Sequence, residues 1–328
     1  ETDNTRIVAP PHGSMLPMSP VRKNILMVAC ALGLLIPVVI IFICENMNTR
    51  VRGRKDLESV TVPFIGEIPL FTRKKKGIFR KKPQEVRAIV VKEGSRDIIN
   101  EAFRVLRTNL EFMTGKDKAS NVIIVTSFNP GSGKSFLTMN IAVSFAIKGK
   151  KVLVIDGDLR HGSASSYIDS PTKGLSDYLG GRIDNLNEII VTNPKQKYLD
   201  ILPVGTIPPN PTELLFDDRL KQVIDTVREQ YEYVLIDCPP IELVADTQII
   251  EKLADRTIFV VRAGLLELSM LAELEKIYGE KKYKNMSLIL NGTEGSGGRY
   301  GYRYGYRYGY HYGYGSEYHY GSDEKYIE

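Results

Sequence analysis

The fold of this chain is decided by the stretch Val122–Ser135, which reads VIIVTSFNPGSGKS. Its first five residues are apolar or β-branched and predict a buried strand, after which a helix is expected over Ser135–Lys148. Glycines in the loop between them let backbone N–H groups close around phosphate oxygens, and the helix presents its N-terminus to the anion. The stretch therefore predicts a phosphate-binding loop, in which Lys134 reaches the β- and γ-phosphates and Ser135 ligates Mg²⁺.

The match of this loop to the motif G-x-x-x-x-G-K-[ST] is imperfect, because Phe128 stands at the first glycine position. GSGKS alone could be a chance loop. Its place between a strand and a helix favours nucleotide binding, with ATP and Mg²⁺ as cofactors. The residues expected around the nucleotide are Pro130, Gly131, Ser132, Gly133, Lys134, Ser135 and Phe136.

Two more apolar runs end in carboxylates. VLVIDGDLR, at residues 152–160, places Asp156 and Asp158 after a strand, and YVLIDCPP, at residues 233–240, ends in the same way with Asp237. Side chains two apart in an extended chain point to one side, so the first two can act as a pair that holds Mg²⁺ and accepts a proton from a hydroxyl. Each aspartate could instead be a helix N-cap. Strand C-termini are, however, where open α/β sheets bind ligands.

Alternating strands and helices predict one α/β domain at residues 95–293, long enough for a single core. The expected strands are Val122–Thr126, Val152–Ile155, Leu199–Pro203, Tyr233–Ile236, Thr257–Val261 and Met286–Leu290. The expected helices are Ser135–Lys148, Thr212–Tyr231, Ile241–Ala254 and Ser269–Tyr278. The strands are almost continuously apolar, which predicts a buried, mostly parallel sheet of the Rossmann-like P-loop type. Asn291, at a strand end, is a candidate for contact with adenine.

Composition excludes several other classes. The 328 residues suggest about two domains, and 43% apolar with 25% charged residues argues against wholesale disorder. The formal charge is only +5. Three cysteines, at positions 30, 44 and 238, give neither a disulfide framework nor a CxxC metal pair. The chain starts at Glu1 without a methionine, which fits a fragment or a processed product.

A membrane segment precedes the domain. Residues 25–44 read ILMVACALGLLIPVVIIFIC and carry no charge over 20 residues, about 30 Å of helix. A buried core helix is the alternative. More basic residues follow the segment than precede it, so we expect the C-terminal side to be cytoplasmic and residues 1–24 to be an extracytoplasmic stub.

Residues 45–94 are expected to form a basic juxtamembrane linker. Seven Lys or Arg and no acid lie between Arg73 and Lys82. Such a block is attracted to anionic lipid by about 1 kcal/mol per basic residue, but a solvated linker would have the same composition. Both interpretations stay open.

The C-terminal residues 294–328 form a tail that is rich in Tyr and Gly and has no aliphatic run, so we expect it to be disordered. An aggregation-prone segment is one alternative and a β-strand is another. A third interpretation, that the tail is an autophosphorylation substrate, is implied by the family resemblance given in the next paragraph. The tyrosines of the tail are Tyr300, Tyr302, Tyr304, Tyr306, Tyr308, Tyr310, Tyr312, Tyr314, Tyr318, Tyr320 and Tyr326.

The order of phosphate loop, hhhDxDxR and hhhDxPP resembles the bacterial tyrosine kinases of capsular and exopolysaccharide systems. The resemblance extends to residues 101–109, which are similar to the ExxRxxR helix of that family, and to residues 205–215, which are similar to its PPNPxELL stretch. The membrane segment followed by PFIGEIP resembles the end of the polysaccharide chain-length regulator module to which such kinases are fused. The resemblance thus covers nearly the whole chain.

The resemblance implies a protein-tyrosine kinase at the bacterial inner membrane with its kinase domain in the cytoplasm. Lys134 would neutralise phosphate charge, Ser135, Asp158 and Asp237 would organise Mg²⁺, and Asp156 and Asp158 would divide base and metal duties, with Asp156 favoured as base. Glu101, Arg104 and Arg107 would support a homo-oligomeric ring, although an exposed helix face with ordinary ion pairs would look the same. The implied partners are a neighbouring tail, the polysaccharide polymerisation and export machinery, a tyrosine phosphatase and membrane lipid, with no nucleic acid.

Two alternatives are kept. The first is a membrane-associated deviant P-loop ATPase of the partitioning and division type. Those relatives carry KGGxGK, and here Asn129 stands at the position of the signature lysine, which argues against it. The second is a non-catalytic nucleotide-sensing scaffold of a polysaccharide export complex, with the tail as a docking strip.

Overall fold

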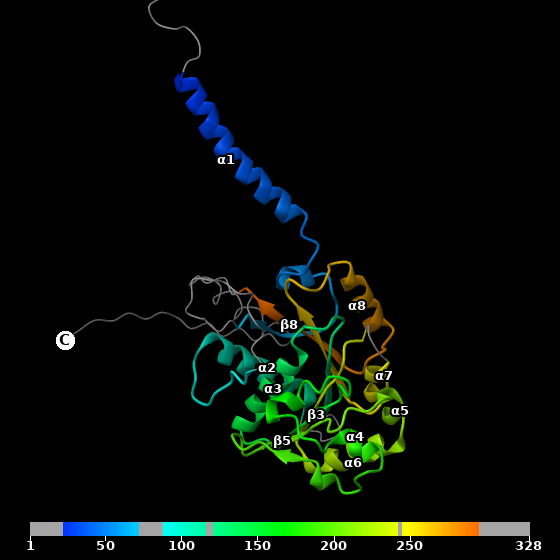
Figure 1. Ribbon diagram of the computed structural model, residues 1–328. Coiled ribbons are helices and arrows are strands. Elements are labelled where there is room, and N and C mark those ends of the chain that lie inside the picture. The colour runs from blue at the N-terminus through cyan, green and yellow to red at the C-terminus, as the bar shows by residue number, and fades with distance from the viewer. Residues whose placement is uncertain (1–21, 72–87, 116–120, 242–244, 295–328) are drawn as a thin grey trace, which may run out of the picture. The chain divides into compact units, whose positions relative to one another are not determined.

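The structure is a computed structural model that describes residues 22–71, 88–115, 121–241 and 245–294 (Figure 1). It divides into two units, Glu1–Thr49 and Arg50–Glu328. The tail tyrosines, Arg73–Lys82 and residues 1–21 of the expected stub lie outside the described residues.

The first unit contains helix α1, Arg22–Asn46, with Pro37 inside it. Within the described residues, Arg22–Ile43 is long and apolar enough to cross a membrane, and none of it is buried. This exposure favours the predicted membrane segment over a buried core helix, because a core helix covers its apolar side chains with protein.

The second unit is built on an eight-stranded sheet in the order β1-β8-β7-β2-β6-β3-β5-β4. All neighbouring strands run parallel except β4 and β5, which are antiparallel. The strands are β1 Phe64–Pro69, β2 Val122–Thr126, β3 Val152–Asp156, β4 Val191–Thr192, β5 Leu199–Leu202, β6 Tyr233–Asp237, β7 Arg256–Arg262 and β8 Met286–Thr293. Every residue of β2, β3, β6 and β8 is buried, as expected for parallel strands covered on both faces. The predicted α/β fold with a mostly parallel sheet is confirmed.

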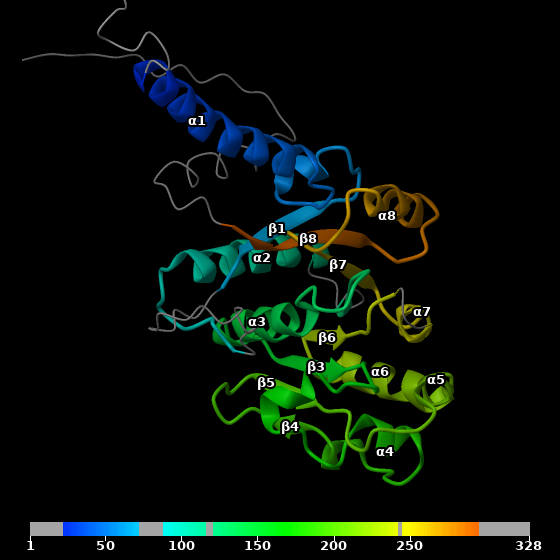
Figure 2. The ribbon, with the colours of Figure 1, turned by 45° about the horizontal axis from the view of Figure 1, so that its top comes forward.

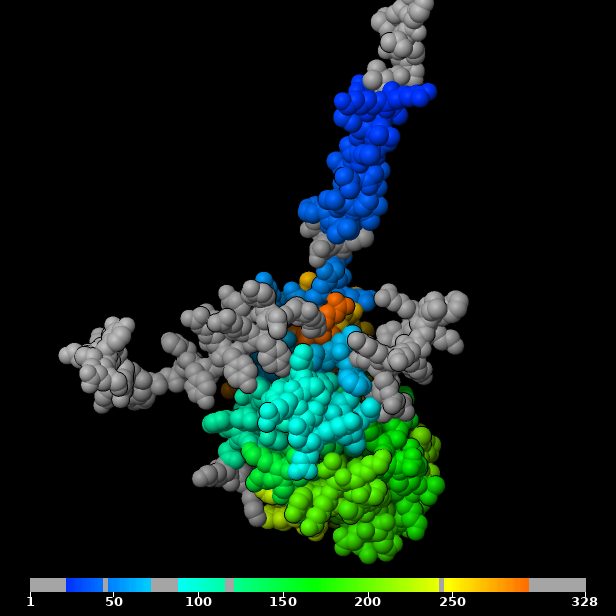
Figure 3. Space-filling model, turned by 90° about the vertical axis from the view of Figure 1, so that its left-hand side faces the viewer, coloured from blue at the N-terminus to red at the C-terminus, as the bar shows by residue number. Residues whose placement is uncertain are grey.

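Helices cover both faces of the sheet (Figure 2). One face packs against α2, Ile98–Thr114, and α3, Lys134–Ile147. The other face packs against α4 Leu175–Leu179, α6 Asp218–Gln230, α7 Asp246–Glu251 and α8 Met270–Gly279. Figure 3 shows the side of the molecule on which α2 comes to the surface.

The expected linker at residues 45–94 contains part of the folded unit, which is a correction. Strand β1 adds to the sheet edge beside β8, with Ile68 opposite Asn291. Val51 and Val62 are buried in the core that lies under α6 and α8. The sequence analysis missed β1 because the strand is only six residues long and no adjacent run was predicted as a strand. Its partner in the sheet, β8, lies more than 200 residues away in the chain.

The expected helix Thr212–Tyr231 is two helices in the structure, which is a second correction. Helix α5, Pro211–Leu215, ends before Asp217, whose carboxylate accepts from the backbone N–H of Arg219 and caps α6. An N-cap aspartate adopts an extended backbone, so the helix cannot run through it. Short 3₁₀ turns at Arg54–Leu57, Ser165–Ile168 and Leu186–Glu188 complete the described elements.

Candidate nucleotide and phosphoryl-transfer site

The phosphate-binding loop connects β2 to α3, as the sequence predicts. Gly131 and Gly133 have φ angles of +75° and +89°, a left-handed backbone that glycine adopts without strain. The Ser132 hydroxyl donates to the carbonyl oxygen of Asn129 at 2.8 Å and closes the loop on itself. Helix α3 begins at Lys134 directly after the loop, so its first free N–H groups face the site of the anion.

Asn291, near the end of β8, holds this loop from the side. Its buried Nδ2 donates to the carbonyl oxygen of Ser132 at 2.8 Å. A Cβ atom at Gly133 would lie 2.2 Å from the same nitrogen, so only glycine fits there. The expected contact of Asn291 with adenine stays a prediction, whereas its contact with the loop is a feature that sequence reasoning missed.

Replacing Asn291 with alanine should weaken nucleotide binding. The change leaves the buried Ser132 carbonyl without its partner, which costs about 1–3 kcal/mol, or about 5- to 150-fold in affinity if the loop loses its shape. Calorimetric titration with MgATP measures this loss. The control is Asn285→Ala, because Asn285 lies just before the other end of β8 and donates to an exposed backbone carbonyl. Equal ATP affinities of Asn291→Ala and wild type would contradict the prediction.

Strand register brings two of the predicted aspartates together. Asp156 on β3 lies directly opposite Asp237 on β6, and Asp237 lies opposite Val125 on β2, next to the start of the phosphate loop. Both carboxylates are buried, with exposed fractions of 0% and 1%. The parallel sheet thus places the predicted carboxylates beside the predicted phosphate loop.

Burial sets the charge of this cluster. Burial, reinforced by the Asp156 carboxylate and opposed by Ser135 and Lys134, raises the pKa of Asp237 to about 8. Burial also raises the pKa of Asp156 to about 6, against hydrogen bonds from Ser165 that lower it. Desolvation lowers the pKa of Lys134, and the negative charge of Asp237 opposes that effect. Both aspartates and Lys134 thus have charged forms that a bound cation and polyphosphate would stabilise.

Asp237 fits a cation. Both of its carboxylate oxygens are buried and lack a hydrogen-bond partner of normal geometry within the described chain. The Ser135 hydroxyl is close enough to lower the pKa of Asp237. A carboxylate and a hydroxyl beside a phosphate loop suit Mg²⁺, which keeps several waters and takes its other ligands from the phosphates. The described residues accordingly contain no group of three His, Cys, Asp or Glu that would form a closed metal cage.

Asp156 and Asp158 are held differently. The Oδ2 atom of Asp156 accepts from both the N–H and the hydroxyl of Ser165 at 2.6 Å. Asp158 is slightly more exposed, at 7%, and its Oδ1 accepts from the N–H groups of Arg160 and His161 at 3.2 Å. The raised pKa of Asp156 suits a base. Asp156 is, however, fully buried and bound by Ser165, whereas Asp158 lies nearer to solvent. The division of base and metal duties between the two stays a prediction.

Arg160, the last residue of hhhDxDxR, ties this loop to the PPNPxELL stretch. Its Nε donates to Oδ2 of the fully buried Asp246 at 3.2 Å, and its Nη2 donates to the hydroxyl of Thr212 at 3.0 Å. The Thr212 hydroxyl donates to the other oxygen of Asp246 at 2.6 Å. Two motifs far apart in the sequence therefore meet through Asp246, which no sequence signal marked.

The three predicted oligomerisation residues lie on α2 and have partners within the chain. Arg104 binds Glu101 and the carbonyl of Ser95. Arg107 donates to the carbonyl oxygen of Ser144 on α3 at 2.7 Å. Of these contacts, the Arg107 bond joins α2 to α3, and a role in a ring stays a prediction.

The remaining loop predictions divide by exposure. Pro130 and Gly131 are exposed at the tip of the loop, where a ligand can reach them. The ring of Phe136 packs edge-on against Phe103 of α2 with centroids 6.1 Å apart, so its side chain belongs to the core between helices.

The fold and the site together define the chain as a P-loop nucleotide-binding protein. In agreement with this class, residues 120–288 match the family profile described as "AAA domain". It is 35% identical over 209 residues to the tyrosine-protein kinase YwqD of Bacillus subtilis, covering 63% of this chain and 87% of that protein. The chain belongs to the bacterial tyrosine-protein kinases of capsular and exopolysaccharide systems.

Longer relatives share the same region. The putative tyrosine-protein kinase EpsB of Ralstonia solanacearum is 33% identical over 91% of this chain, and the tyrosine-protein kinase etk of Escherichia coli is 31% identical over 80%. The chain spans only 40% and 37% of the length of these two proteins. Among solved structures, the kinase domain of Escherichia coli ETK superposes with a TM-score of 0.65 at 29% identity, covering 80% of this chain and all of that domain. The BceF tyrosine kinase domain gives 0.62 at 30% identity, with 74% and 99% covered.

Proposed function

We propose that this chain is a membrane-anchored, MgATP-dependent protein-tyrosine kinase that phosphorylates the tyrosines of its own C-terminal tail. The observation that carries the proposal is the pairing of Asp156 and Asp237 across adjacent strands beside Lys134. Phosphoryl transfer needs charge neutralisation and positioning more than covalent chemistry, and this cluster supplies both.

Each residue has a proposed task. Lys134 and the N-terminus of α3 would bind the phosphates, and Ser135 and Asp237, with Asp158, would hold Mg²⁺, which would supply positive charge to the transferred phosphoryl group. The tyrosine hydroxyl gives its proton to the Asp156–Asp158 pair as its oxygen bonds to the γ-phosphorus and the bond to the ADP oxygen breaks. Burial keeps water away from these groups, which strengthens their electrostatic interactions.

The test incubates the full chain, in lipid or detergent, with MgATP and maps phosphate by peptide mass spectrometry. We expect phosphotyrosine at positions within Tyr300–Tyr326, with ADP formed in step. ATP turnover without labelled tyrosine would instead support the membrane-associated ATPase, and absence of both would support the nucleotide-sensing scaffold. A chain ending at Glu294 is the control, because it should lose the label and keep its affinity for ATP.

We further propose that the kinase forms a ring at the cytoplasmic face of the inner membrane, in which the tail of one subunit enters the site of its neighbour. The exposed apolar helix α1 supports membrane anchoring, and the relatives support a place in polysaccharide polymerisation and export. The basic residues between Arg73 and Lys82 would contact membrane lipid. A tyrosine phosphatase would reset the tail.

Phosphorylation should disassemble such a ring. Each phosphotyrosine adds about −1.5 to −2 charge, and tyrosines two apart in an extended chain lie about 7 Å from one another, within a Debye length of about 8 Å. We therefore expect partial occupancy of the tail and a smaller particle after phosphorylation. Multi-angle light scattering of phosphorylated and phosphatase-treated chain measures this, and equal masses for the two would contradict it.

A further inference from the structure

We propose that residues 207–218, the exposed segment around α5, form the docking surface for the tail segment Arg299–Tyr314. The inference deepens the proposed function, because it names the surface that delivers the tail tyrosines to the site. The segment reads IPPNPTELLFDD and contains the PPNPxELL stretch, helix α5 and the first residue of α6. This segment is called the docking segment below.

The docking segment exposes large apolar side chains in a folded unit that buries most of its own. Ile207 is 60% exposed and Phe216 is 66% exposed, one on each side of α5. These two apolar side chains, on one short segment with exposed acids, offer apolar contacts to the tyrosine rings of a bound peptide.

The docking segment is joined to the chain that follows β3 through one of its own residues. Thr212 is bound by Arg160 and Asp246, as described above. The backbone just before the segment is held as well, because the Ser165 hydroxyl, which donates to Asp156, accepts from the N–H of Val204 at 2.9 Å. A peptide bound on the segment would therefore lie at a defined position relative to the predicted base.

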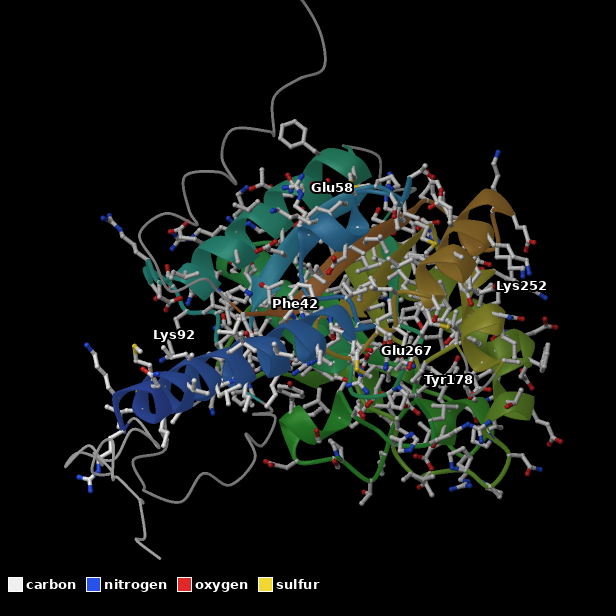
Figure 4. All side chains as sticks on the ribbon, turned by 90° about the horizontal axis from the view of Figure 1, so that it is seen from above. Phe42, Glu58, Lys92, Tyr178, Lys252 and Glu267 are labelled. Atoms are coloured by element: carbon white, nitrogen blue, oxygen red, sulfur yellow. The ribbon has the colours of Figure 1, made fainter. Side chains whose placement is uncertain are left out.

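Helix α4 supports the near end of the segment. The Asp177 carboxylate accepts from the N–H of Thr206 at 3.1 Å, and the N–H of Ser176 donates to the carbonyl of Val204 at 2.9 Å. Arg219 of α6 donates to the carbonyl of Tyr178 at 2.8 Å and lies over its ring, whose position Figure 4 labels. The views of Figures 1 and 2 agree in placing α4, α5 and α6 together. The exposed side chains therefore stand on a rigid base.

Charge selects the occupant. Within the docking segment, Glu213, Asp217 and Asp218 are exposed acids, and no Lys or Arg is present. The tail segment Arg299–Tyr314 has the opposite character, with three arginines, tyrosine at every second position and no acid. Arginine pairs with carboxylates, tyrosine packs on exposed apolar and proline side chains, and the match in sign speeds encounter.

The length of chain beyond the last strand allows this contact. β8 ends at Thr293, at the carboxyl edge of the sheet, and Arg299 follows six residues later. The docking segment follows β5, and the strand order puts β8 five strand spacings from β5, about 24 Å. The residues between Thr293 and Tyr306 can extend over about 43 Å, enough to reach this segment on the same or a neighbouring subunit.

The same charges would release the product. Two phosphates add about −3 to −4 to the tail segment, which cancels or reverses its formal +3. A phosphorylated stretch is then repelled by the acids of the docking segment, so an unmodified stretch can replace it.

The first test measures initial rates of tail labelling in the full chain. Glu213→Lys with Asp218→Lys should lower the rate at low salt by about tenfold, in line with the rate gains that complementary charge gives to encounter, and leave ATP affinity unchanged. Changing Arg299, Arg303 and Arg307 to Glu in the same chain should restore the rate to within about threefold of wild type, because the charges are again complementary. The matched control is Asp225→Lys with Glu229→Lys, the same charge change further along α6, which should have little effect. Unchanged labelling in the first variant, or no recovery in the swapped chain, would overturn the proposal.

The second test needs no catalysis, and so separates failure of the docking surface from failure of the kinase. The full chain carries the photo-crosslinking residue p-benzoylphenylalanine in place of Tyr306, and is irradiated without nucleotide. Peptide mapping should find the crosslink on residues 207–218, and it should be lost at high salt and in Glu213→Lys with Asp218→Lys. Crosslinks that map elsewhere, or that persist in that variant, would overturn the docking surface even if the kinase labels its tail.

Discussion

Lys134→Met should abolish tyrosine labelling while leaving the fold intact. In the proposed mechanism, the ammonium group of Lys134, the only Lys or Arg among residues 127–135, binds the β- and γ-phosphates, and loss of a single such charge-stabilising donor costs about 10²–10³ in rate. The protein itself should tolerate the change. Desolvation already lowers the pKa of Lys134, which means that burial disfavours its charged form, and methionine has a similar shape without that penalty.

The measurement is the initial rate of phosphotyrosine formation on the full chain, together with the melting temperature in the absence of nucleotide. Lys148→Met is the matched control, since Lys148 caps the other end of α3 and pairs with Glu111 on the surface at 2.9 Å. An exposed pair of this kind contributes about 0–1 kcal/mol, so the control should label at nearly the wild-type rate. If Lys134→Met labels tyrosine at the rate of the control, Lys134 is not needed for phosphoryl transfer and the prediction is wrong.

Asp237→Asn should stop phosphoryl transfer. In the absence of metal, the same variant should also be more stable than the wild type, by an amount that grows as the pH increases. Because the folded-state pKa of Asp237 is raised to about 8 from 3.8, the folded state retains a proton that the unfolded chain has released. The stability that this proton contributes is complete below about pH 4 and is lost as the pH rises through about 8. Asparagine is neutral throughout, so the variant escapes that loss.

Thermal unfolding in EDTA at several values between pH 4 and 9 measures this difference. At pH 8 the variant should exceed the wild type by at least one pKa unit's worth of free energy, about 1.4 kcal/mol, or about 3–6 °C in melting temperature. Near pH 4 the two should be alike. Asp225→Asn, on the exposed face of α6, is the control and should show no such trend. If the difference in melting temperature between Asp237→Asn and wild type does not grow with pH, the raised pKa of Asp237 is contradicted.

The burial of Asp237 explains why Asp237→Asn should lower activity and yet raise stability without metal. A buried carboxylate with no hydrogen-bond partner of normal geometry among the described residues costs folding free energy when charged, and it is a ligand that suits a divalent cation. We therefore expect Mg²⁺ with nucleotide to stabilise the wild type much more than Asp237→Asn. This couples stability to the state of the site.

The sequence predicted the phosphate loop and five of the six expected strands to within two residues at either end, because these features are local. A glycine-rich loop between an apolar strand and a helix has few alternatives, and near-continuous apolar runs identify buried parallel strands. Only the end of β8 lies further out, three residues past the expected Leu290. The tail and the basic block were read from composition, and they lie outside the described residues.

By itself, then, the sequence determined the class of fold, the loop and the three aspartates at strand ends, because their chemistry is written in short runs of residues. Only the tertiary structure decided that β1 joins the sheet, that Asn291 holds the loop across a separation of 159 residues, and that Arg160 meets Asp246 86 residues further on. Those contacts depend on strand order and register, which are set by how the whole chain packs and not by any local pattern.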